Sequence, residues 1–191
     1  MVTTAFSQIA AVLLAAGRGE RFGGDKLAAR LGDRAVVDHA ASALARLPFG
    51  WHIAVVPQGA PPLRGFACVS PAIAEPVHSQ SLACGVAAAK EFGASAVLIC
   101  LGDMPLVPEN HIRALVAGFD GDRIVSTANG RAMPPALFGA QHFDALLALR
   151  GDRGASALLG GALAVALPAN AEIDVDTPED LALARAIIGR P

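Results

Sequence analysis

Short apolar runs alternate with helix-like runs from one end of this chain to the other. Such an alternation is typical of α/β units, in which helices pack on the faces of a largely parallel sheet. The segment 57–76, rich in Pro and Gly, is expected to be a loop with one short strand. Strands are expected at 9–15, 51–56, 96–101, 123–127 and 162–167, and helices at 35–47, 79–92, 108–117, 140–149, 153–159 and 178–188.

Length and composition fit one compact domain over residues 1–191, because no linker or repeat divides the chain. A domain of this size buries about 70% of the surface that its unfolded chain exposes. The balance of 15 Lys and Arg against 17 Asp and Glu argues against a nucleic-acid partner. The first apolar run is too short for a membrane span and follows no basic segment, so we expect a cytoplasmic protein with no membrane partner. Three cysteines without a CxxC pair favour buried free thiols over a disulfide framework or a zinc site.

The segment LAAGRGERFGGDKL, residues 14–27, directly follows the first predicted strand. Its four glycines leave backbone amides open to phosphate oxygens. Three cations accompany them, namely Arg18, Arg21 and Lys26. A Walker motif would require Lys where Asp25 stands, and a dinucleotide fingerprint would require Gly where Phe22 stands. The segment therefore predicts a triphosphate site that follows neither of the two common phosphate motifs.

Carboxylates follow the third predicted strand and precede the last predicted helix. Asp103 stands in LGDMP, where the run 96–101 ends, so it reaches the same sheet edge as the glycine loop. Asp174 and Asp176 are two residues apart and fall on one side of an extended segment. Because Mg²⁺ prefers carboxylates together with phosphate oxygens, Asp103 with one of the other two is predicted to hold this ion. Asp176 or Thr177 would alternatively serve as the N-cap of the last helix.

These segments together resemble the MobA-like nucleotidyltransferase superfamily. The motif LAAGxGxRxG, followed closely by Lys, is its signature, and LGDMP matches its acidic, Mg²⁺-binding motif. The resemblance implies an α/β fold of the Rossmann-like three-layer α/β/α type with a mostly parallel sheet, as in nucleotide-diphospho-sugar transferases. Asp176 is closer than Asp174 to the position of the superfamily's second acidic residue.

The resemblance also assigns roles to single residues. The backbone of residues 17–23 with Arg21 would hold the β and γ phosphates, while Lys26 would reach the α phosphate. A cation there stabilises the charge that builds as an acceptor oxygen attacks, so Lys26, Arg21 and Asp103 are the expected catalytic residues. HSQSLACGV resembles the segment that closes over the base and ribose, although its polar residues also suit helix capping. The expected nucleotide-binding residues are Leu14, Ala15, Ala16, Gly17, Arg18, Gly19, Lys26, Ser79, Gln80 and Ser81, of which Ala15, Ala16 and Gly17 would face the nucleobase.

Two further segments, GRAMPPALFG and LRGDRGAS, resemble the region that faces the pterin in the molybdopterin cytidylyltransferase branch. Met133 stands where that branch usually has His, so the first segment departs from the pattern. Asp152 and Arg153 are the expected acceptor-binding residues and would orient an acceptor phosphate. The alternative is that they cap the predicted helix 153–159.

The sequence therefore predicts a Mg²⁺-dependent nucleotidyltransferase that transfers CMP from CTP to a phosphorylated acceptor, with molybdopterin favoured, and releases pyrophosphate. Transfer would be a direct in-line displacement without a covalent intermediate. Ala16 favours CTP, since the guanylyl branch typically begins LAGG at this point. Open alternatives are GTP-dependent guanylyl transfer to molybdopterin, nucleotidyl transfer to a sugar or alditol phosphate, a dinucleotide-dependent oxidoreductase, and a non-catalytic nucleotide-binding module. A molybdoenzyme or a maturation protein is the expected macromolecular partner.

Overall fold

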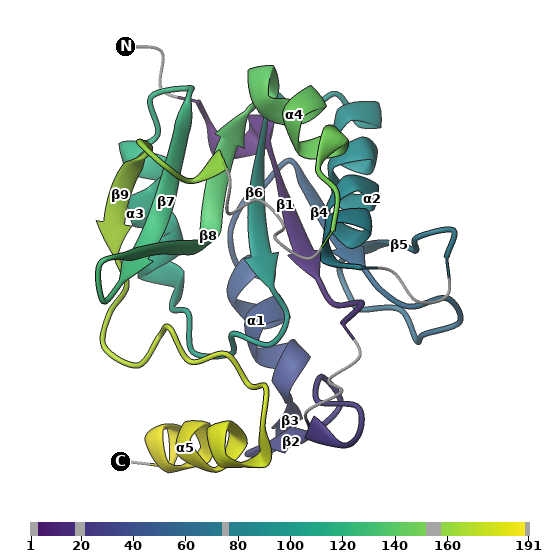
Figure 1. The fold of residues 1–191 in the computed structure, drawn as a ribbon, viewed down its shortest axis with the longest axis vertical. Helices are drawn as coiled ribbons and strands as arrows, with labels where there is room; N and C mark the ends of the chain where they lie inside the picture. Colours follow the sequence, from purple (N-terminus) through teal and green to yellow (C-terminus); the bar gives the residue numbers. More distant parts are fainter. Residues whose placement is uncertain (1–3, 18–21, 74–76, 152–157, 190–191) are drawn as a thin grey trace.

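A seven-stranded sheet forms the centre of the fold (Figure 1). The computed structural model describes residues 4–17, 22–73, 77–151 and 158–189. From one edge to the other the strands are β5 (Ala67–Val69), β4 (Trp51–Val55), β1 (Ile9–Leu14), β6 (Ala96–Leu101), β8 (Arg131–Gly139), β7 (Arg123–Ala128) and β9 (Leu163–Ala166). Neighbouring strands are parallel except where β8 pairs with β6 and with β7. The predicted mostly parallel sheet is confirmed.

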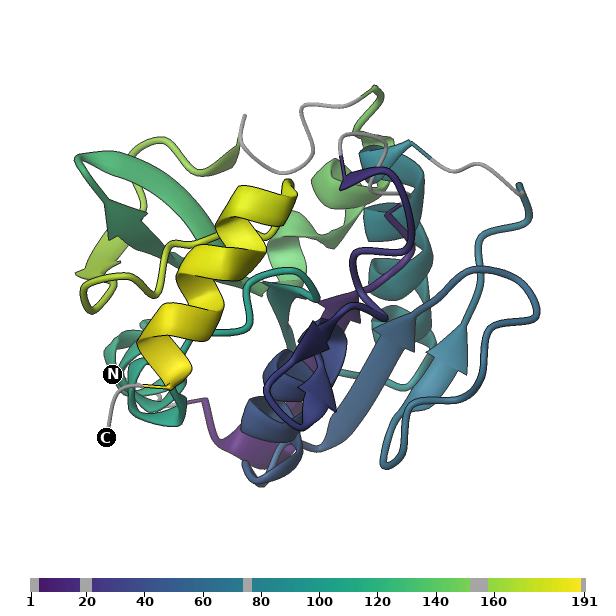
Figure 2. The ribbon, with the colours of Figure 1, turned by 90° about the horizontal axis from the view of Figure 1, so that it is seen from below.

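Helices cover both faces of this sheet, so the fold is a three-layer α/β/α sandwich of the Rossmann-like type. One face carries α1 (Val36–Ala45) and α3 (Glu109–Gly118), and the other carries α2 (His78–Glu91) and α4 (Phe143–Ala148). The last helix, α5 (Pro178–Ile188), lies beyond the carboxyl ends of the parallel strands (Figure 1, Figure 2). It packs against a small hairpin of β2 (Arg30–Leu31) and β3 (Arg34–Ala35).

The central strand β1 shows why the sheet lies inside the molecule. All six of its residues are buried, because successive side chains point to opposite faces and helices cover both. Leu13 belongs to the core under α1 and α3, whereas Val12 belongs to the core under α2. Helix α2 approaches closely at Gly85, where a Cβ atom would lie 2.5 Å from a Val12 methyl group. Apolar packing on both faces thus fixes the strand whose end carries the glycine loop.

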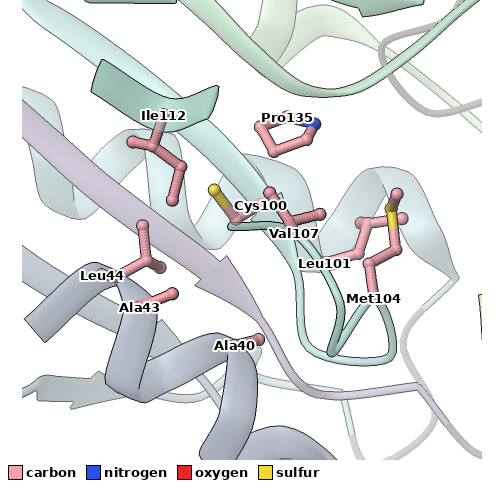
Figure 3. Close-up of a pocket in the computed structure, with 9 residues that line it drawn as sticks. All are labelled: Ala40, Ala43, Leu44, Cys100, Leu101, Met104, Val107, Ile112 and Pro135. Atoms are coloured by element: carbon pink, nitrogen blue, oxygen red, sulfur yellow. The ribbon is translucent and has the colours of Figure 1, made fainter. Parts of the chain in front are cut away.

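A small cavity between α1, α3 and the end of β6 belongs to the core (Figure 3). Apolar side chains line it, including Leu44, Cys100 and Ile112. Its volume of about 10 Å³ accommodates nothing larger than a water molecule. Burial raises the pKa of the Cys100 thiol, which therefore stays protonated and unreactive. Cys84 is half-buried, but Cys68 is exposed, so the prediction of buried thiols is wrong for Cys68.

Strand β8 is the main element that the sequence pattern did not predict. Pro134 and Pro135 lie within it, and prolines are unusual inside a strand because they donate no hydrogen bond to the ladder. The structure accommodates both prolines where the register of β8 against β7 shifts, between Val125 and Ser126. A bulge therefore explains why a proline-containing segment can occupy the interior of the sheet.

Smaller differences concern short segments. The helix predicted at 140–149 begins as the 3-10 helix η3 (Ala140–His142) and continues as only six residues of α4. The helix predicted at 153–159 lies mostly outside the described residues. The β2–β3 hairpin was not predicted, since two residues per strand give no periodic signal. The remaining regular element of the described residues is the first 3-10 helix, η1 (Phe6–Gln8). Among the helices of the described residues, none is long and apolar enough to cross a bilayer.

Candidate active site

Four charged side chains meet at the carboxyl edge of the sheet, beyond the ends of β1 and β6. Lys26 Nζ lies 2.6 Å from Asp103 Oδ2, 2.5 Å from Asp176 Oδ1 and 3.9 Å from Asp174 Oδ1. With all three carboxyl groups ionised, this cluster carries two more negative than positive charges. Because Lys26 is only 6% exposed, water screens its interactions weakly. The structure thus brings together the lysine and the three aspartates that the sequence singled out.

Backbone contacts hold the turn after β6 against its two neighbouring segments. Gly102 N donates a hydrogen bond to Leu14 O at 2.9 Å, and a Cβ atom on Gly102 would lie 3.1 Å from the same oxygen. This close approach favours glycine at the turn. Val175 N donates to Asp103 O at 2.9 Å, and the Val175 side chain is fully buried. Val175 packs in the core, while the two aspartates that flank it both lie close to Lys26.

The N-cap of α5 is Thr177. Its Oγ1 atom accepts a hydrogen bond from Asp180 N at 3.2 Å, and Asp180 Oδ2 accepts one from Thr177 N at 2.8 Å. This reciprocal pair is a capping box, which satisfies two amides at the start of the helix. Asp176 is therefore not the cap, and its Oδ1 atom accepts a hydrogen bond from Lys26.

Burial and the charges of the cluster together shift two pKa values. Burial alone would lower the pKa of Lys26, but the charge of Asp103 and hydrogen bonds to Asp103 and Asp176 raise it overall. Lys26 is consequently an ammonium ion at neutral pH. Burial, with the charge of Asp103 as the next cause, raises the pKa of Asp174 to about 7, although Lys26 acts in the opposite direction.

The carboxylate oxygens of this cluster fit a divalent cation. One oxygen from each of Asp103, Asp174 and Asp176 lies within 4.8 Å of the others. Asp103 Oδ1 and Asp174 Oδ1 are buried and have no hydrogen-bond partner, which is unfavourable unless a cation or another group meets them. Hard divalent cations prefer oxygen ligands, and such an ion would neutralise the two excess negative charges.

A larger cavity begins where the glycine loop leaves β1. Its volume is about 600 Å³, and Ala15, Ala16 and Gly17 form part of its wall. The lining also includes residues that no sequence motif indicated, namely Leu27, Val37, Val56, Pro57, Ala60, Pro61, Pro62 and Leu63. Several of them belong to the Pro- and Gly-rich loop after β4. This loop begins at the same sheet edge as the glycine loop, and that position is the one sequence feature that could have indicated these residues. Leu14 is 8% exposed and packs in the core on the α2 side of the sheet.

The N-terminus of α2 buries two of the three polar side chains that were expected to bind the nucleotide. Ser79 and Ser81 are only 2% and 6% exposed. Gln80 Oε1 accepts a hydrogen bond from Val77 N at 3.0 Å, so capping, one of the two interpretations of this segment, is observed for Gln80. Nucleotide contact by these residues stays a prediction. The remaining predicted site residues lie outside the described residues, namely Arg18, Gly19, Arg21, Asp152 and Arg153.

The fold and this acidic, lysine-containing sheet edge are those expected of a nucleotidyltransferase. Comparison with known families agrees, because the MobA-like NTP transferase domain matches residues 11–167 of the chain. The protein belongs to this family of MobA-like NTP transferase domains.

Individual proteins are also similar to this chain. The purine catabolism protein PucB of Bacillus subtilis (strain 168) is 34% identical over 118 residues, which span 59% of this chain and 58% of PucB. The crystal structure of Rv0371c from Mycobacterium tuberculosis H37Rv has a TM-score of 0.82 at 26% identity, over 94% of this chain and 98% of that one. A structure of Rv0371c in complex with manganese has a TM-score of 0.75 at 22% identity, over 94% and 98% of the two chains. At that identity the second structure supports the fold alone.

Proposed function

We propose that residues 1–191 form a single Mg²⁺-dependent nucleotidyltransferase domain that transfers CMP from CTP to a phosphorylated acceptor, with molybdopterin favoured and pyrophosphate released. Membership of the MobA-like family supports the reaction class. The observation that carries the proposal is the meeting of Lys26 with Asp103, Asp174 and Asp176 beside the start of the glycine loop. The choice of CTP depends on Ala16, and the choice of molybdopterin depends on the resemblance of LRGDRGAS to the cytidylyltransferase branch.

Lys26 would act on the α phosphate of the nucleotide. Its raised pKa keeps the ammonium group charged, and its low exposure makes that charge effective. As an oxygen of the acceptor phosphate attacks the α phosphorus, negative charge builds on the surrounding oxygens, and a nearby cation stabilises it. The bond to pyrophosphate then breaks. The backbone amides of the glycine loop with Arg21 would hold the β and γ phosphates in line with the attack.

The carboxylates would hold the divalent cation. We assign Asp103 as one ligand and Asp176 or Asp174 as the second, and the two buried oxygens without partners support this assignment. Once bound, Mg²⁺ supplies neutralisation of the triphosphate charge.

The cavity beside Ala15, Ala16 and Gly17 supports a base-binding role for this wall, since a flat base needs apolar surface and backbone groups to contact. Ser79, Gln80 and Ser81 are proposed to close over the base and ribose. Asp152 and Arg153 are proposed to orient the acceptor phosphate. A molybdoenzyme or a maturation protein would receive the product.

Pyrophosphate release tests the proposal. Each of the four NTPs is incubated with the protein and Mg²⁺, with and without molybdopterin, and with a sugar phosphate in parallel. We expect release with CTP and molybdopterin together. Release with GTP would instead identify the guanylyl reaction, and release with a sugar phosphate would change the acceptor. If no NTP reacts with any phosphorylated acceptor, the proposal is wrong and a non-catalytic nucleotide-binding module is left.

A further inference from the structure

Lys26 contacts the same carboxylate groups that a divalent cation would use. Its Nζ atom lies 2.6 Å from Asp103 Oδ2 and 2.5 Å from Asp176 Oδ1, so two of the three carboxylates already have a cation against them. The third, Asp174, presents Oδ1 at 3.9 Å from the same Nζ atom. The ammonium group thus contacts two of the three carboxylates and lies close to the third.

The lysine does not satisfy all the oxygens of these carboxylates. Asp103 Oδ1 and Asp174 Oδ1 stay buried without hydrogen-bond partners, and the group of four side chains keeps a net negative charge. A divalent cation would neutralise that charge. The ligand oxygens lie within 4.8 Å of one another, however, so an ion bound to them would stand within a few ångströms of an ammonium group that stayed in place. Two cations at such a distance in a poorly screened site repel each other strongly.

We propose that Lys26 and the divalent cation compete for these carboxylates, so that Lys26 holds them in the nucleotide-free protein and releases them when the metal binds. This inference rests on the proposed function, because the triphosphate gives the released ammonium group a new partner at the α phosphate. The protein alone would bind the metal weakly. Nucleotide and metal would then favour each other's binding, since each relieves the repulsion that the other meets.

The first experiment measures Mn²⁺ affinity without nucleotide, by electron paramagnetic resonance titration of the free ion. Lys26→Met removes the competitor, so this variant is expected to bind Mn²⁺ about tenfold more tightly than the wild type. Lys26→Arg keeps the positive charge and is expected to stay as weak as the wild type. Lys90→Met is the matched control, because Lys90 is the chain's other lysine and pairs with Asp144 on the surface. Equal or weaker Mn²⁺ binding by Lys26→Met would overturn the proposal.

The second experiment uses the wild-type protein and does not depend on how the variants fold. Acylation of the two lysines by a water-soluble ester is quantified by mass spectrometry, with Lys90 as the internal reference. Lys26 is 6% exposed in the described structure and is expected to react slowly. Saturating Mg²⁺ is expected to raise its labelling severalfold relative to Lys90, and CTP with Mg²⁺ is expected to suppress it again. No change with Mg²⁺, or a decrease, would overturn the proposal.

The competition for the carboxylates and the proposed reaction can be excluded separately. If the wild type releases pyrophosphate but Lys26→Met binds Mn²⁺ no more tightly, the competition is wrong and the proposed function stands. If no NTP is turned over while Lys26→Met gains Mn²⁺ affinity, the competition stands and the proposed reaction is wrong.

Discussion

Two buried polar groups of this molecule differ in charge and in how completely they are hydrogen-bonded. In the core, His111 Nε2 donates to Ser126 Oγ at 2.8 Å, and Ser126 Oγ donates to Pro135 O at 2.7 Å. This series of hydrogen bonds is neutral. The Ser126 hydroxyl group donates its proton and also accepts a hydrogen bond on a lone pair. At the sheet edge, Lys26 and its three aspartates keep a net negative charge and two buried oxygens without partners.

The difference separates a structural polar group from one kept for a ligand. A neutral group whose hydrogen bonds are all made within the protein adds rigidity and needs no ligand. A charged cluster with unpaired oxygens is unfavourable by itself, and it becomes favourable when a cation or a polyanion with its metal completes it. Disruption of the first group should therefore reduce stability, and disruption of the second should reduce activity.

Removal of the ammonium group should have the largest effect. Lys26→Ala is expected to lower the rate of pyrophosphate release about 10³-fold, because the charge that builds at the α phosphate loses its cation. Nucleotide binding, measured by equilibrium dialysis, should change little. Lys90→Ala is the control and should leave both quantities unchanged. Release within about threefold of the wild-type rate would exclude a catalytic role for Lys26.

Loss of the carboxylate after β6 should come next. Asp103→Asn is expected to lower pyrophosphate release about 10²-fold, since the amide is a weaker ligand than the carboxylate. In the presence of CTP, the substitution should also abolish the rise in melting temperature that we expect Mn²⁺ to give the wild type, as measured by calorimetry. Asp33→Asn serves as the control, because the Asp33 side chain is 91% exposed. An undiminished Mn²⁺ effect in Asp103→Asn would place the metal elsewhere.

Disruption of the hydrogen bonds between His111, Ser126 and Pro135 should change stability alone. Ser126→Ala leaves His111 Nε2 and Pro135 O without their shared partner and is expected to lower the free energy of unfolding by about 1–3 kcal/mol. Pyrophosphate release by the folded variant should match the wild type. Ser95→Ala, at an exposed serine that donates to Gln8 O, is the control and should change stability by less than about 0.5 kcal/mol. A loss of activity in Ser126→Ala without a loss of stability would contradict the distinction.

The pH dependence of stability should reveal the contribution of His111, with a smaller effect than the Ser126 substitution. Burial lowers the pKa of His111, so below the ordinary histidine pKa of about 6.5 the unfolded chain binds more protons than the folded one. The His111 contribution to the free energy of unfolding is present above that pH and is lost as pH falls, by up to about 1.4 kcal/mol per pH unit. Urea unfolding of the wild type and His111→Gln at pH 7.5 and 5.5 measures this. The stability difference between the two proteins should shrink at the lower pH, and a constant difference would rule His111 out as the cause.

Much of the fold was predictable, because its central strands are apolar on both faces. The runs at β1 and β6 are distinct for that reason, and the carboxyl ends of parallel strands must share an edge. The meeting of Lys26 with Asp103 follows from those two facts. Strand β8 was not predictable from its residues, since its two prolines lie in a bulge of β8 that appears only in its pairing with β7.

The finer features of the site depend on contacts between distant segments. The spacing of Asp174 and Asp176 predicts that both point to one side, but only the Thr177 capping box shows that Asp176 is not the helix cap. The cavity wall after β4 likewise forms where that loop meets residues near α1, and no local pattern indicates such a contact. The burial of Ser79 and Ser81 reflects how α2 packs on the sheet.

Anomalous diffraction from crystals grown with Mn²⁺ and CTP tests the central claim most directly. The account predicts an anomalous peak bound by an oxygen of Asp103 and by an oxygen of Asp176 or Asp174, with Lys26 Nζ on the α phosphate. A manganese peak that contacts none of the three aspartates, or a nucleotide bound away from Lys26, would contradict it.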